Sequence, residues 1–107
     1  MKNISKLLLI SGIILFAKCA SLPKAPADAE FGAAQKKWSD VKMEDLTGGH
    51  TIYTTRCNTC HGLKKIADYN QDTWTKLIDA MAPKAKLSAE ETEKLRKYIY
   101  AARETSN

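Results

Sequence analysis

Three residues that can form bonds or coordinate a metal stand together near the middle of the chain, in the segment Cys57-Asn58-Thr59-Cys60-His61. On a helical turn, side chains three and four positions apart point to the same side. The thiols of Cys57 and Cys60 therefore face the same way, and the imidazole of His61 lies on that face too. Such a cluster can bond one flat organic group at two points and place a nitrogen ligand beneath it.

The pattern Cys-x-x-Cys-His is the attachment sequence of haem c. His61 is then expected to be the proximal ligand of the iron. Three other uses of the thiols compete with this one. A thioredoxin-like redox pair needs a βαβ context, which the pattern of the chain lacks, and a plain disulfide is also open. A structural zinc site needs four ligands, and the remaining candidates, His50 and Cys19, are badly placed.

Met81 is the expected sixth ligand of the iron. One face of a predicted helix carries four large apolar residues at helical spacing: Trp74, Leu77, Ile78 and Met81. Met81 therefore points inward, and Pro83 follows where the chain can bend over the haem. A methionine that only fills the core is the alternative, and Met43 is a second candidate thioether.

Two aromatic residues and one histidine near the motif also have expected positions relative to the haem. Tyr53 and Trp74 are expected to pack against the haem, with an ordinary core position as the alternative for each. His50 stands 11 residues before His61, which is about 16 Å along a continuous helix. We therefore expect His50 at the surface and not at the iron.

Helical patterns dominate the rest of the chain. A helix is expected over residues 44 to 58, and a second between Asp72 as N-cap and Pro83 as its stop. Ser88 and Glu91 form a capping box for the last helix, whose buried face is expected to hold Leu95, Tyr98, Ile99 and Ala102. No strand pattern or repeat occurs, so the expected fold class is all-α with three to four helices.

The N-terminal segment has the pattern of an export signal. Lys2 and Lys6 precede an apolar run of 11 residues, from 7 to 17, whereas a membrane-spanning helix needs about 20. Cys19 follows directly, as the lipidated cysteine of a bacterial lipoprotein does, although Lys18 stands where a small residue is usual. Ordinary cleavage near residues 17 to 21 is the alternative. The sequence predicts an exported, periplasmic protein that is tethered to a membrane as a lipoprotein.

The charge of the chain gives no reason to expect a nucleic-acid partner. The formal net charge is +5, but three of the 17 basic residues and none of the 12 acids lie in the first 18 positions. The remaining basic residues are spread among acids, as on an ordinary solvated surface. The expected organisation is an export signal over 1–18, a tether and N-terminal extension over 19–42, a haem domain over 43–103 and a tail over 104–107.

The segment from 44 to 102 resembles the class I cytochrome c family. It is most similar to the small helical haem domains of quinohaemoprotein amine dehydrogenase. The resemblance is carried by the haem motif with a tyrosine before it, a tryptophan-containing helix, a methionine and a final helix that opens with Leu-Ser-x-Glu-Glu: Tyr53, Trp74, Met81, Leu87 to Glu91 and Tyr98. It implies a small cytochrome c-like fold in which Gly48 or Gly49 lets the last helix pack closely against the first.

The resemblance also implies a function. The expected protein is a single-haem electron carrier, not an enzyme, with one covalent haem c and its iron. Its partners would be a dehydrogenase, a reductase or an oxidase. A haem sensor or a gas- or peroxide-reactive protein with an open iron position is one alternative. A haem subunit of a larger oxidoreductase is another.

Overall fold

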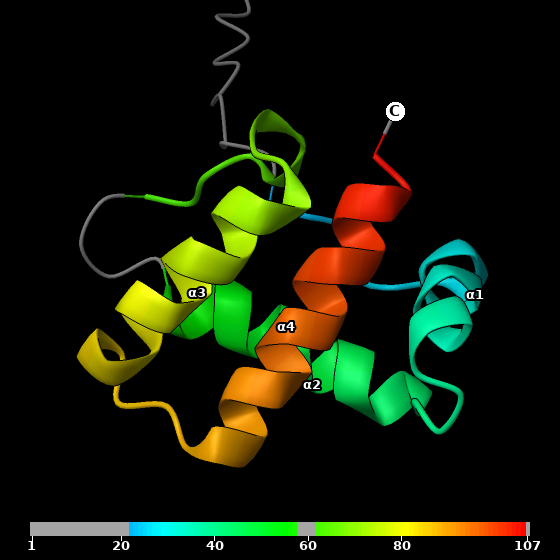
Figure 1. Cartoon of the computed structure of the whole chain (residues 1–107), viewed down its shortest axis with the longest axis horizontal. Helices are drawn as coiled ribbons and strands as arrows, with labels where there is room; N and C mark the ends of the chain where they lie inside the picture. Colours follow the sequence, from blue (N-terminus) through cyan, green and yellow to red (C-terminus); the bar gives the residue numbers. More distant parts are fainter. Residues whose placement is uncertain (1–21, 58–61, 107) are drawn as a thin grey trace, which may run out of the picture.

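The computed structural model describes residues 22–57 and 62–106, and this part of the chain forms four α-helices and one short 3-10 helix (Figure 1). The elements are α1 (Asp28–Lys37), α2 (Met43–Arg56), η1 (Ile66–Asp68), α3 (Gln71–Lys84) and α4 (Ala89–Glu104). No strand occurs in either described range. The expectation of an all-α fold with three to four helices is therefore confirmed.

Helix α4 is the element against which the others pack. Helices α1 and α3 lie on opposite sides of α4, and α2 crosses behind it (Figure 1). The predicted capping box opens α4, because the Ser88 hydroxyl accepts a hydrogen bond from the Glu91 amide at 3.1 Å and the Glu91 carboxylate accepts one from the Ser88 amide at 3.0 Å. The predicted buried face is also present, except that Ala101 is fully buried while Ala102 is only half-buried.

The crossing of α2 and α4 depends on a glycine. A Cβ atom added to Gly49 would lie 2.1 Å from the Lys94 carbonyl oxygen and 2.5 Å from the Tyr98 Cβ. At the neighbouring Gly48 the nearest atom would be the flexible Cδ of Lys94, at 3.1 Å. The close approach that the sequence predicts at one of the two glycines therefore occurs at Gly49.

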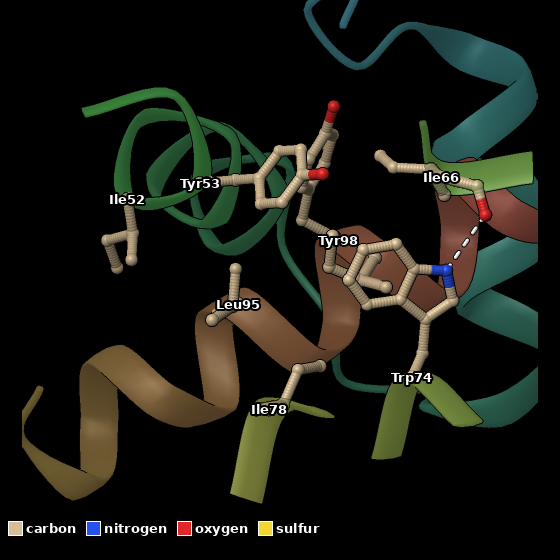
Figure 2. Packing of buried hydrophobic residues seen from close by; sticks show 8 residues of the cluster. Ile52, Tyr53, Ile66, Trp74, Ile78, Leu95 and Tyr98 are labelled. Carbon is tan, nitrogen blue, oxygen red and sulfur yellow. Dashed lines mark hydrogen bonds between the residues drawn. The ribbon is translucent and has the colours of Figure 1, made fainter. Parts of the chain in front are cut away.

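The main core lies where α2, α3 and α4 meet (Figure 2). Its buried members are Ile52, Tyr53, Ile66, Trp74, Ile78, Leu95, Tyr98 and Ile99. Burial, with a smaller contribution from the Glu30 carboxylate, raises the pKa of Tyr98 to about 12. A second cluster lies on the α1 side and consists of Ala34, Val41, Leu46 and Ala101, with Phe31, Trp38 and Met43 packed around it.

The segment before α2 differs from the tether that the sequence predicts. Helix α1 begins at Asp28, inside the segment 19–42 that we expected to be a tether and N-terminal extension, and it packs against α4. The carbonyl oxygens of Pro23 and Lys24 accept hydrogen bonds from His50 Nε2 at 2.8 Å and from the Tyr98 hydroxyl at 3.3 Å. The local amino-acid composition of this segment could not predict these contacts, because the partners of Pro23 and Lys24 lie 27 and 74 residues away in the sequence.

Two predictions about the ends of α3 are wrong. The N-cap is Asn70, whose side chain accepts a hydrogen bond from the Thr73 amide at 2.8 Å, and Asp72 lies in the first turn. Pro83 does not stop the helix but lies inside its last turn. The helix ends because Lys86 adopts a left-handed backbone conformation with φ of 56°.

Two hydrogen bonds complete the left-handed end of α3. The Lys86 amide bonds to the Pro83 carbonyl at 3.1 Å and the Leu87 amide bonds to the Ala82 carbonyl at 3.0 Å. This is the Schellman arrangement, which satisfies carbonyl groups that have no partner within the helix.

The expected export signal over 1–18 and Cys19 lie outside the described residues. In the parts that are described, every helix is too short or too polar to cross a membrane.

Replacing Gly49 by alanine is expected to lower the free energy of unfolding by about 3 kcal/mol, because the new methyl group overlaps backbone atoms that cannot move independently. Gly48→Ala is the matched control. It should raise the free energy of unfolding by about 0.5 kcal/mol, since alanine is the better helix former and Lys94 can swing aside. Urea denaturation of both variants measures the difference, and equal stabilities would contradict the close crossing.

Candidate functional site

A pocket of about 370 Å³ lies beside the end of α2, between the segment that starts at Gly62 and helix α3. This volume lies within the range of about 300 to 1,000 Å³ that is usual for small-molecule sites. Apolar side chains form most of its wall. The lining residues are Tyr53, Arg56, Cys57, Gly62, Leu63, Lys64, Trp74, Leu77, Ala80, Met81, Lys84 and Ala85.

Four of the residues singled out in the sequence line this one pocket. Tyr53 and Cys57 come from α2 and its C-cap, and Trp74 and Met81 come from α3. Cys60 and His61 lie outside the described residues, as does the proposed lipidation site Cys19. The described part of the predicted site is thus brought together, although its two halves are separated by 17 to 28 residues in the chain.

Cys57 stands at the point where α2 ends. It is the C-cap residue of that helix, with φ of −87° and ψ of −6°, and it packs against the main core while remaining half-buried. Burial raises the pKa of its thiol, and the Arg56 guanidinium opposes this effect only in part.

Met81 lies on the pocket face of α3, one helical turn beyond Leu77. It is half-buried, so its thioether lies at the wall of the pocket and not deep in the core. The two other candidate ligands lie elsewhere. Met43 packs in the second cluster, and His50 bonds to Pro23 and contacts the Tyr98 ring edge-on, with 5.3 Å between ring centroids.

Aromatic rings form the inner wall of the pocket, and their polar atoms are turned toward backbone groups. The Trp74 indole donates a hydrogen bond to the Ile66 carbonyl at 2.8 Å (Figure 2). The Tyr53 hydroxyl donates to the Lys64 carbonyl, and burial raises its pKa. The two rings meet edge to face with centroids 6.0 Å apart. Because their polar atoms already have partners, both residues offer apolar surface to the pocket.

The charged residues that line the pocket, within the part of the chain that the structure describes, are all cations: Arg56, Lys64 and Lys84. None of these three was predicted from the sequence to be a site residue. Lys84 follows Met81 by one helical turn, and Arg56 directly precedes Cys57, so spacing from the predicted ligands would have found both. Lys64 belongs to a loop and carries no comparable signal.

These features fit a haem group. Haem is a flat and largely apolar ring with two carboxylates at one edge, so it matches an apolar, aromatic wall with cations around it. The pocket also contains a thiol and a thioether, which are the groups required for covalent attachment and for an axial ligand. No cluster of three or more histidine, cysteine or acidic residues that would suit a bare metal ion occurs within 22–57 and 62–106.

Comparisons of the chain with protein-family models, with curated proteins and with solved structures found no match.

Replacing Tyr53 by phenylalanine is expected to lower the free energy of unfolding by about 1 kcal/mol, because the Lys64 carbonyl loses its hydrogen-bond donor. Tyr69→Phe is the control, since the Tyr69 hydroxyl only accepts a long hydrogen bond of 3.4 Å from an exposed lysine. That change should stay within about 0.5 kcal/mol. Chemical denaturation measures the free energy of unfolding of the two variants. A larger decrease for Tyr69→Phe than for Tyr53→Phe would disprove the stabilising role of the Tyr53–Lys64 hydrogen bond.

Proposed function

We propose that this chain is a single-haem c-type cytochrome of the class I type, which carries electrons outside the cytoplasm. Cys57 and Cys60 would hold one haem c covalently, with His61 as the proximal ligand and Met81 as the distal ligand. One observation carries the proposal. The first cysteine of a haem-attachment motif lines the same apolar pocket as the methionine expected as the sixth ligand.

When bound, the haem supplies an iron that exchanges one electron between its ferrous and ferric states. The side chains of the pocket set the conditions for that exchange. Leu63, Leu77 and Trp74 line the pocket with apolar surface, which would keep water from a bound haem and disfavour its more highly charged ferric state. Arg56, Lys64 and Lys84 favour a group that brings negative charge. Tyr53 holds the Gly62–Lys64 loop in place through the Lys64 carbonyl.

An electron carrier is a better proposal than an enzyme or a sensor because of the ligand set. With His61 and Met81 both bound, the iron has no open position for a substrate, a gas or a peroxide. A haem protein with an open position is the second candidate, and the behaviour of the protein toward carbon monoxide separates the two. Co-purification with an oxidoreductase would indicate the remaining alternative, a haem subunit of a larger complex.

The N-terminal pattern supports the proposed location. An export signal followed by a lipidated Cys19 would place the protein in the periplasm and tether it to a membrane. Covalent haem attachment and electron exchange with a dehydrogenase, a reductase or an oxidase are compatible with that compartment.

Replacing Cys57 and Cys60 together by alanine is expected to yield a protein without covalent haem. Haem staining after denaturing electrophoresis and the pyridine haemochrome spectrum measure the loss in a host that matures c-type cytochromes. Cys19→Ser is the matched control, because it removes a thiol outside the motif. It should keep the haem and release the protein from the membrane fraction. A colourless wild-type protein would disprove the proposed function.

Replacing Met81 by alanine is expected to lower the reduction potential, since a methionine ligand raises it. The ferrous protein should also bind carbon monoxide at least about tenfold more tightly, which corresponds to about 1.4 kcal/mol for the ligand that no longer has to be displaced. Met43→Ala is the control, because Met43 packs in the second cluster. It should leave carbon monoxide binding unchanged. Tight binding of carbon monoxide by the wild-type protein would favour the sensor instead.

A further inference from the structure

Arg56 connects the end of α2 to the turn that follows α3. Its Nη2 donates hydrogen bonds to the carbonyl oxygens of Ala85 at 2.6 Å and of Lys86 at 3.2 Å. Its Nη1 lies 3.4 Å from a carboxylate oxygen of Glu91, in the first turns of α4. A single side chain next to Cys57 therefore contacts both the turn that follows α3 and the beginning of α4.

The turn after α3 needs stabilising contacts such as the hydrogen bonds from Arg56. Lys86 holds a left-handed conformation there, with φ of 56°, which is costly for a residue other than glycine. The carbonyl groups at the end of a helix also lack partners within it, and a cation satisfies them while it interacts favourably with the helix dipole. Arg56 supplies these contacts from a different helix.

Met81 belongs to the same end of α3. Its carbonyl oxygen accepts the hydrogen bond of the Ala85 amide at 2.9 Å, and the carbonyl of Ala85 is the one that Arg56 binds at the shorter distance. The position of Met81 relative to the end of α2 therefore depends on whether the Ala85–Lys86 turn stays against Arg56.

The two carbonyl bonds, and not the ion pair with Glu91, give the contact its strength. The Arg56 and Glu91 side chains are 40% and 37% exposed, and ion pairs of that exposure contribute little because water screens them. Hydrogen bonds from a charged donor are shorter and stronger than neutral ones. They also fix direction, because the planar guanidinium can bond two neighbouring carbonyls at once.

We propose that Arg56 is a positioning residue that holds Met81 in reach of the iron, by clamping the end of α3 to the haem-attachment end of α2. This inference rests on the proposed function, because it concerns the ligand set of the haem. It differs from a general effect of positive charge in the pocket, which Lys64 and Lys84 share.

The test uses the full chain with its haem and three variants. Arg56→Gln removes the clamp and the charge, and Arg56→Lys keeps the charge and one carbonyl bond. Lys65→Gln removes the charge of an exposed lysine that does not line the pocket. Two quantities are measured: the affinity of the ferric protein for added imidazole, which competes with Met81, and the amide hydrogen exchange of Lys86 and Leu87. Met81→Ala provides the imidazole affinity of a protein without the ligand.

Arg56→Gln is expected to bind imidazole roughly tenfold more tightly than the wild-type protein, in line with the loss of hydrogen bonds from a charged group. The Lys86 and Leu87 amides should exchange faster by a similar factor. Lys65→Gln should stay within about twofold of the wild type in both measurements, and Arg56→Lys should fall between the two.

Three results would overturn the inference. Unchanged imidazole affinity in Arg56→Gln, even with lower stability, would leave Arg56 with a purely structural role. Equal imidazole affinities for Met81→Ala and the wild type would show that Met81 is not the ligand, while the covalent haem stands. A wild-type protein without covalent haem would remove the proposed function and the inference together.

Discussion

Helices α2 and α4 cross with almost nothing between them at Gly49, where an added Cβ would lie 2.1 Å from a carbonyl oxygen of α4. The pocket depends on this crossing. Because α4 also carries α1 and α3 (Figure 1), it fixes the distance between the end of α2, where Cys57 stands, and the face of α3 that holds Met81. A side chain at position 49 would push α2 away from α4 and change the width of the pocket.

Around that crossing, the described side chains leave no buried polar atom without a partner. The polar atoms of Trp74 and Tyr53 are among those that have a partner, because each donates a hydrogen bond to a carbonyl of the segment between α2 and α3. The same two bonds turn apolar surface toward the pocket and hold the segment that follows the Cys-x-x-Cys-His sequence. A chain of this size gains little net stability from its core alone. A large apolar group bound in the pocket would therefore add to the stability of the fold.

Local patterns were a good guide where the decisive contacts are local. The presence of a helix before Cys57, the Ser88–Glu91 capping box and the inward face of α3 all follow from spacing within one helix, although α2 (Met43–Arg56) ends before the expected residue 58. The local sequence patterns gave wrong predictions where several short-range signals compete. Asn70 and Asp72 are both good N-cap residues, and Pro83 suggests a helix stop that the left-handed Lys86 provides three residues later. The packing of α1 and the bonds to Pro23 and Lys24 could not be predicted, because they join segments far apart in the chain.

The sequence by itself determined the helical class and the candidate chemistry, because a thiol, a thioether and an imidazole are properties of residue types and their spacing. Only the tertiary structure decided which of these groups line the same pocket. It brought Met81 to the pocket of Cys57 and placed Met43 and His50 elsewhere. It also assigned Arg56 to the turn after α3, a contact across 29 residues. Spacing along one helix predicts a face, but the partner of that face depends on how closely two helices can approach.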